Sequence, residues 1–204
     1  MHLYITRHGE TKENVKGILQ GRTPGNLNDT GIEQARLLGG ALRNKDISAI
    51  HSSDLDRAID TALIISDLIG AVLVPESSLR ERNLGIFEGK SWDEYFKAQE
   101  NSGFSHFDYK PEGGESISDI QNRVKPILLD LTDGHQRSNI LIMGHGGLNT
   151  ILLDMLLPMS LPEIWKIGQS NACINQLEVI GSMEAKAIIL NDTQHLAVNH
   201  DTIK

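Results

Sequence analysis

The first residues that could do chemistry are an arginine and a histidine that follow a short apolar run. Leu3 and Ile5 alternate with other residues as in a β-strand, and the run leads directly into Arg7 and His8, followed by a glycine. A guanidinium offers a rigid fork of donors that fits phosphate oxygens, and a neutral imidazole can act as a nucleophile. The pair predicts that His8 attacks a group held by Arg7. The alternative is an ordinary turn with a solvated arginine.

A second histidine occupies a matching position much later in the chain. Residues 139–143 form a continuous apolar run, typical of a strand buried on both faces, and this run ends in Gly144 and His145. The carboxyl ends of parallel strands lie at one edge of a sheet, where ligands bind in α/β proteins. We therefore expect His8 and His145 to converge on one crevice, although 137 positions separate them (145 − 8).

Further charged residues follow other predicted elements. Arg57 lies near the start of a helix that Ser53 or Asp54 is expected to cap, and helix N-termini attract anions. The alternative role for Arg57 is a surface charge paired with Asp54 or Asp60. The segment 79–89 is punctuated by glycines and carries several acids.

The composition limits the class of protein. The chain has 204 residues, of which 39% are hydrophobic and 23% charged, so it can form one domain with a sizeable core. Its net charge of -8 disfavours nucleic acid and anionic membranes as partners, so an anion site must be a local concentration of positive charge. The single cysteine, Cys173, excludes an intrachain disulfide framework and is expected in the core of a late strand.

The sequence also limits cofactors and location. It has no His-Glu-x-x-His motif, no cysteine pair and no P-loop, so we expect neither a metal ion nor another cofactor. No run approaches the ~20 apolar residues that span a bilayer, and no leader pattern precedes the first strand. We therefore expect a cytoplasmic protein that binds a small molecule rather than nucleic acid or a membrane. A late strand pair offers an edge for a possible homodimer.

Alternating strands and helices predict an α/β fold. We expect a three-layer sandwich in which helices cover both faces of a mostly parallel central sheet. A single domain is predicted over residues 1–204, with an insert at about 90–114 that covers a substrate pocket. The expected strands lie near residues 3–6, 47–51, 71–74, 139–143, 173–180 and 185–190, and the expected helices near 30–43, 55–65, 92–100, 117–131 and 147–157.

Several local features are predicted along this pattern. Thr30 and Glu33 have the spacing of a capping box, and the segment 12–29 before them is expected to be irregular. Pro126 should kink the helix that contains it, and Pro162 should break the chain. The last two strands should be joined by a hairpin turn at Gly181-Ser182.

The chain resembles the histidine phosphatase superfamily, in particular the branch of phosphoglycerate mutases and small-molecule phosphatases. Six ordered motifs, spread from Leu3 to about Leu196, carry the resemblance, and together they are far more specific than any one alone. They are Arg7-His8-Gly9-Glu10-Thr11 with Asn14 and Gly21; Gly31 with Gln34-Ala35; Ser53 with Arg57-Ala58 and Thr61-Ala62; Glu81 with Gly85, Glu88 and Gly89; Gly114-Glu115-Ser116; and Gly144-His145-Gly146.

The resemblance implies a phosphoglycerate mutase-like fold and a two-step, metal-independent reaction. His8 would become a phosphohistidine while Arg7, Arg57 and His145 hold the oxygens of the transferred group. The further implied substrate contacts are Asn14, Gln20, Gly21 and Gly146.

An acid is also needed to protonate the leaving alkoxide and then to activate water. Glu81 occupies the position that corresponds to the family's acid. Glu76, Glu88 and Asp93 are near in sequence and are alternatives for this role.

The substrate end distinguishes hydrolases from mutases in this family. Mutases commonly have a tyrosine where this chain has Leu84, a lysine where it has Trp92, and an insert with an arginine pair, whereas residues 90–110 here contain no arginine. We therefore expect a phosphatase that hydrolyses small phosphorylated metabolites. The alternatives are a cofactor-dependent phosphoglycerate mutase and a non-catalytic phosphate-binding domain. Within the insert, His106 is the one further histidine that could contribute to the site.

Overall fold

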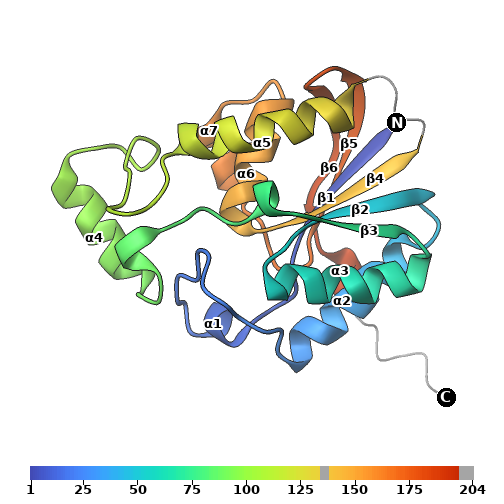
Figure 1. Ribbon diagram of the computed structural model, residues 1–204, viewed down its shortest axis with the longest axis horizontal. Helices are drawn as coiled ribbons and strands as arrows, with labels where there is room; N and C mark the ends of the chain where they lie inside the picture. The colour runs from blue at the N-terminus through green and yellow to red at the C-terminus, as the bar shows by residue number, and fades with distance from the viewer. Residues whose placement is uncertain (134–137, 198–204) are drawn as a thin grey trace.

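The centre of the molecule is a sheet of six strands (Figure 1). The computed structural model describes residues 1–133 and 138–197, so the remainder of the predicted domain lies outside the described residues. The strand order is β3-β2-β4-β1-β5-β6. The first four in this order pair in parallel, and β5 and β6 join them antiparallel. The strands are β1 (His2–Arg7), β2 (Ile47–Ser53), β3 (Val72–Glu76), β4 (Asn139–Gly144), β5 (Ile174–Gly181) and β6 (Glu184–Asp192).

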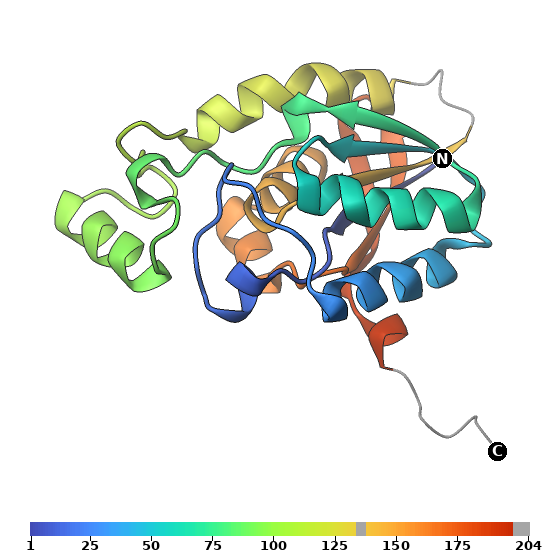
Figure 2. The ribbon, with the colours of Figure 1, turned by 60° about the horizontal axis from the view of Figure 1, so that its bottom comes forward.

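Helices cover both faces of this sheet (Figures 1 and 2). Helices α2 (Asp29–Leu42) and α3 (Asp56–Ile69) cover one face, and α5 (Ile117–Thr132) and α6 (Gly146–Leu156) cover the other. The central strand β4 serves both layers, because its successive side chains point to opposite faces. Ile140 and Ile142 pack with α5 and α6, whereas Leu141 and Met143 pack with α2 and α3. The three-layer α/β sandwich predicted from the sequence is confirmed.

The register of β1 and β4 brings two sequence motifs together. The two strands are parallel neighbours, with Arg7 opposite Gly144, so the residues that follow them emerge side by side. On the other side of β4, strand β2 runs parallel and ends at Ser53, just before α3. The ends of β1, β4 and β2 therefore lie side by side at the carboxyl edge of the sheet.

Two predicted helix starts are wrong. Helix α2 begins after Asn28, whose Oδ1 accepts the Gly31 amide at 2.8 Å, so Thr30 lies inside the helix and forms no capping box. An asparagine is as good an N-cap as a threonine, and here it comes earlier in the chain. Helix α3 is capped by neither Ser53 nor Asp54. Its N-cap is Leu55, which makes no side-chain capping bond, and the Ser53 hydroxyl accepts the amide of Leu55 rather than an amide of the helix.

Other local predictions also need correction. The segment predicted to be irregular contains α1 (Lys12–Val15), because Thr11 and Asn14 cap each other's amides. Pro162 lies in the first turn of α7 (Leu161–Ile167), where no intrahelical donor is needed, and does not break the chain. Helix α5 continues through Pro126 to Thr132, and the kink predicted at Pro126 stays a prediction. The hairpin between β5 and β6 turns at residues 182–183, one position later than predicted.

The insert forms a lobe at one end of the molecule (Figure 1). It contains α4 (Trp92–Ser102), and its small core comprises Phe87 and Tyr95, packed against Leu19 and Leu84. Arg82 holds this lobe to the rest of the chain, because its guanidinium donates to the Tyr95 hydroxyl and to two backbone carbonyls.

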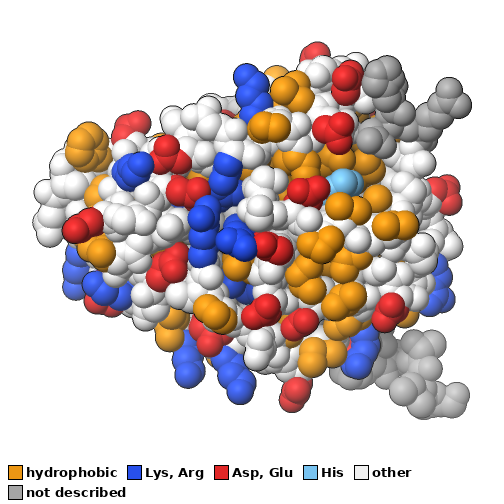
Figure 3. Space-filling model, in the orientation of Figure 1, with side chains coloured by type: hydrophobic (Ala, Val, Ile, Leu, Met, Phe, Trp, Pro, Cys, Tyr) orange, Lys and Arg blue, Asp and Glu red, His pale blue; other side chains and the backbone are white. Residues whose placement is uncertain are grey.

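The surface has apolar side chains at both edges of the sheet. Val72 on β3 is 65% exposed, and Ile188 and Ile189 on β6 are also exposed. Figure 3 shows apolar side chains gathered over β3 and α3. The homodimer predicted from the late strand pair stays a prediction. Within residues 1–133 and 138–197, no helix has the length and apolar character needed to cross a bilayer.

Candidate active site

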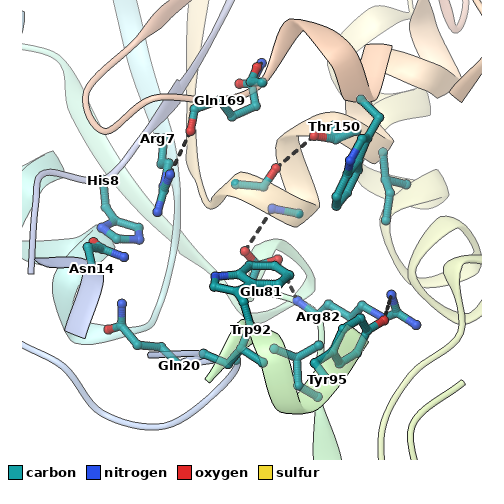
Figure 4. A pocket seen from close by; sticks show the side chains of 18 of the residues that line it. Arg7, His8, Asn14, Gln20, Glu81, Arg82, Trp92, Tyr95, Thr150 and Gln169 are labelled. Atoms are coloured by element: carbon teal, nitrogen blue, oxygen red, sulfur yellow. Dashed lines mark hydrogen bonds between the residues drawn. The ribbon is translucent and has the colours of Figure 1, made fainter. Parts of the chain in front are cut away.

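A cavity of about 360 Å³ lies at the carboxyl edge of the sheet, between the sheet and the insert (Figure 4). This size is typical of small-molecule sites. Nearly all the residues predicted for the site line this cavity, although they come from six different segments of the chain. They are Arg7, His8, Asn14, Gln20, Gly21, Arg57, Glu81 and Gly146.

The imidazole of His8 is buried and oriented by two neighbours. Its Nδ1 lies 2.7 Å from the carbonyl oxygen of Gly9, and Arg57 donates through Nε to its Nε2 at 3.3 Å. A carbonyl can only accept and a guanidinium can only donate, so the proton is on Nδ1 and the lone pair on Nε2. Burial, together with the charges of Arg57 and Arg7, holds the pKa of His8 well below its usual value. Its Nε2 is therefore a neutral nucleophile at pH 7.

His145 is the one predicted residue that lies behind the cavity wall. Its ring centroid is 5.2 Å from that of His8, so the two histidines converge as predicted. Its Nε2 lies 2.8 Å from the hydroxyl of Ser53, at the end of β2, while its Nδ1 is buried and has no hydrogen-bond partner in the described chain. Burial, and then the charge of Arg57, lowers the pKa of His145 well below its usual value.

Arg7 and Arg57 are each held by a backbone carbonyl. Arg7 donates through Nη1 to the carbonyl of Gln169 at 2.7 Å, and Arg57 donates through Nη2 to the carbonyl of Gly21 at 2.7 Å. Burial lowers the pKa of Arg57 to about 10, which still leaves it charged at neutral pH. The alternative of a surface ion pair for Arg57 is wrong, because its side chain is buried and Asp54 binds Arg80 instead.

Glu81 is held at the N-terminus of α6. Its Oε2 accepts the amide of Gly147 at 3.0 Å, and its Oε1 accepts the amides of Leu148 and Arg82 at 2.9 and 2.8 Å. Figure 4 shows the carboxylate directed at the start of this helix. With two donors on Oε1 and one on Oε2, the lone pair left for a proton is on Oε2.

The three alternative acids lie elsewhere. Glu88 accepts the amides of Arg22 and Leu84 through Oε1 and so supports the loop beneath Gly21. Glu76 lies 3.5 Å from His51, and neither it nor Asp93 lines the cavity. Of the four acids considered from the sequence, only Glu81 lines the cavity.

Polar side chains from the loops complete the site. Asn14 accepts through Oδ1 from the Nδ2 of Asn171, which also donates to the carbonyl of His8 at 3.0 Å. Gln20 donates to Thr11, and its buried Oε1 has no partner in the described chain. Sequence reasoning missed Asn171 and Gln169. Both precede β5, and the antiparallel pairing of β5 with β1 brings Asn171 beside His8 and Gln169 beside Arg7.

The residues of the described chain offer no evident metal centre. Within residues 1–133 and 138–197, no three His, Cys, Asp or Glu side chains gather in a way that could hold a metal ion. Cys173 is buried next to β5, and burial raises the pKa of its thiol to about 11.

Comparison with known proteins decides the family. The family model for the histidine phosphatase superfamily, branch 1, matches residues 3–192. The chain belongs to the histidine phosphatase superfamily. It has the phosphoglycerate mutase-like fold of that family, as predicted.

This histidine phosphatase is similar to proteins named for several activities. It is 34% identical over 198 residues to "Putative phosphoserine phosphatase 2" of Hydrogenobacter thermophilus, covering 95% of this chain and 96% of the relative. It is 31% identical over 202 residues to "Phosphoglycerate mutase-like protein 4" of Arabidopsis thaliana, covering 95% and 86%. A mycobacterial glucosyl-3-phosphoglycerate phosphatase in complex with VO3 aligns with a TM-score of 0.83 and 27% identity, covering 94% and 99%.

Proposed function

We propose that this histidine phosphatase is a metal-independent phosphomonoester hydrolase that acts on small phosphorylated metabolites through a phosphohistidine. The observation that carries the proposal is the orientation of His8, whose unprotonated Nε2 lies at the cavity beside Arg57 and Arg7. Relatives named as phosphatases support hydrolysis. A single catalytic domain with the insert as the cover of its pocket is part of the proposal.

The first step transfers the phosphoryl group to the enzyme. Nε2 of His8 attacks phosphorus in line, a P–N bond forms, and the P–O bond to the alcohol breaks. Arg7, Arg57 and His145 supply donors to the equatorial oxygens. Glu81 gives a proton from Oε2 to the leaving alkoxide. The Gly9 carbonyl accepts from Nδ1 and stabilises the positive charge that the ring gains.

The second step returns the enzyme to its resting state. A water molecule gives a proton to Glu81 and attacks phosphorus on the opposite side from Nε2. The P–N bond breaks, inorganic phosphate leaves, and His8 is neutral again. Asn14, Gln20, Gly21 and the start of α6 at Gly146 surround the transferred group in this scheme.

A mutase would need to grip a carboxylate-bearing substrate and protect the phosphohistidine from water. Leu84 and Trp92, which stand at the positions where mutases commonly have a tyrosine and a lysine, both line the cavity. Neither carries a positive charge that could pair with a carboxylate. This contact surface favours hydrolysis over mutase activity.

One assay separates the three candidate functions. The protein is incubated in chelator with p-nitrophenyl phosphate and, separately, with 3-phosphoglycerate, and free phosphate and isomerised product are measured. Phosphate release that persists in chelator and is lost in His8→Ala supports the hydrolase. Isomerisation without release supports the mutase, and neither product supports a binding domain. The cytoplasmic location stays a prediction of the sequence.

A further inference from the structure

The aromatic side chains of this chain are concentrated in and next to the insert, at one end of the cavity. The chain has two Trp, three Tyr and four Phe, and seven of these nine lie within residues 87–109. An eighth, Trp165 on α7, packs against His106 of the insert with 4.4 Å between ring centroids. Only Tyr4 lies elsewhere. Such a concentration requires an explanation beyond general core packing.

The packing of the insert explains only part of this cluster. Phe87, Tyr95 and Tyr109 form the small core that stabilises the lobe. Trp92 and Trp165 do not belong to it, yet both line the cavity while 42% and 38% of their surfaces remain exposed. Large apolar rings exposed at a concave surface are typical of a ligand site, because a ligand that covers them gains free energy.

The positions of the cations that line the cavity disfavour an anionic leaving group next to Trp92 and Trp165. Within the described chain the cations that line the cavity are Arg7, Arg57 and Arg82. The first two adjoin His8, and the guanidinium of Arg82 already donates to the Tyr95 hydroxyl and to the carbonyls of Glu115 and Tyr109. In Figure 4, Arg7, His8 and Asn14 lie on one side of the cavity, and Tyr95 and Arg82 lie on the other.

We propose that Trp92, His106 and Trp165 form a subsite that binds the leaving group of the substrate as a planar, uncharged ring. The proposal rests on the proposed phosphatase function and names its substrate class. The substrate is a phosphomonoester whose alcohol carries an aromatic or heteroaromatic ring, rather than a short acid such as phosphoglycerate or phosphoserine. Ring contacts with Trp92 and Trp165 supply the affinity.

Two esters with the same chemistry at phosphorus test the ring subsite. In 3-phenylpropyl phosphate and n-propyl phosphate the leaving alcohols are alike, because the propyl chain insulates the ester from the ring. We expect kcat/KM to be about tenfold or more higher for the phenylpropyl ester, and 3-phosphoglycerate to be no better than propyl phosphate. Equal values for the two esters, or a preference for 3-phosphoglycerate, would overturn the proposal.

Variants show which residue of the enzyme produces the preference for the phenylpropyl ester. Trp165→Ala should lower the ratio of kcat/KM values for the two esters, because one of the two ring contacts is lost. Phe104→Ala is the control, because Phe104 is an exposed aromatic residue of the insert that does not line the cavity. It should leave the ratio unchanged. A ratio that survives Trp165→Ala, or that falls equally in Phe104→Ala, contradicts a ring subsite at Trp165.

A binding measurement keeps this inference separate from the proposed catalysis. Both tryptophans of the chain line the cavity, so their fluorescence reports occupancy directly. We expect His8→Ala to bind 3-phenylpropyl phosphate about tenfold or more tightly than propyl phosphate. If the native protein hydrolyses no ester but this preference holds, the hydrolase is wrong and the subsite stands. Equal affinities contradict the subsite.

Discussion

At the scale of single residues, the site depends on two histidines that stay neutral because they are buried beside arginines. The pKa values of His8 and His145 both lie well below the usual value near 6.5. In the unfolded chain each histidine would take up a proton as the pH falls below about 6.5, whereas in the folded protein it does not. Below that pH the unfolded state binds more protons than the folded state. The contribution of these two histidines to folding stability is therefore complete above about pH 6.5 and is lost as the pH falls below it.

His145→Gln isolates one of these contributions. Between pH 7.5 and 5.5 the free energy of unfolding of the native protein should fall, and the variant should lose part of that pH dependence, up to about 1.4 kcal/mol per pH unit below pH 6.5. Urea unfolding at the two pH values measures the difference. Identical pH slopes for the two proteins would show that His145 is not held neutral by the fold.

The role of Glu81 as the general acid can be tested with two substrates whose leaving groups differ in their need for a proton. Glu81→Gln keeps an oxygen at the start of α6 but has no proton to give, so hydrolysis of an alkyl phosphate should slow by about 10²–10⁴-fold. p-Nitrophenyl phosphate, whose leaving group needs no proton, should slow much less in the first step. Glu88→Gln serves as the control, since Glu88 does not line the cavity and its loss should affect both substrates alike. Equal losses on both substrates in Glu81→Gln would contradict the assignment.

At the scale of elements, the close approach of α2 to the turn after β1 positions His8. A Cβ atom on Gly31 would lie 2.1 Å from the carbonyl oxygen of Glu10, and one on Gly9 would lie 2.4 Å from the carbonyl oxygen of Gly31. The turn and the helix therefore touch backbone to backbone. Only glycine permits this contact.

Gly31→Ala should push this turn away from α2. We expect a loss of about 1–3 kcal/mol in stability and a large loss of phosphatase activity, because the carbonyl of Gly9 orients His8. Gly40→Ala is the matched control on the same helix. A Cβ there meets nothing within 4 Å, and alanine should stabilise the helix by up to about 1 kcal/mol. Thermal unfolding and activity of both variants are compared. Full activity in Gly31→Ala would contradict this role for the contact.

The elements also show what could be predicted from the sequence. His8 and His145 each follow a strand that its apolar pattern identifies, so their meeting followed from the parallel sheet. Helices α1 and α7 were missed because their starts use a capping box of Thr11 with Asn14 and a proline in the first turn. Asn171 was also missed, because it contacts His8 across 163 positions through antiparallel pairing, which leaves no local pattern.

At the scale of the whole molecule, the cavity at the carboxyl edge of the sheet has two chemically different ends. Cations and histidines at the sheet edge suit a phosphoryl group, and the aromatic insert suits what the phosphoryl group is attached to. The net charge of the chain, -8, repels anions on average, so the attraction for a phosphoryl group must come from this local group of cations. Substrate choice in this account is therefore a property of the insert and α7, whereas the reaction is a property of the sheet edge.

The central claim is that His8 carries the phosphoryl group. The most direct test is to mix the protein with substrate in chelator, stop the reaction in base, and search for the phosphorylated residue by mass spectrometry. The account predicts one added phosphoryl group on His8, labile in acid and absent from His8→Ala. A label on another residue, a label that persists in His8→Ala, or phosphate release by His8→Ala at the native rate would contradict it.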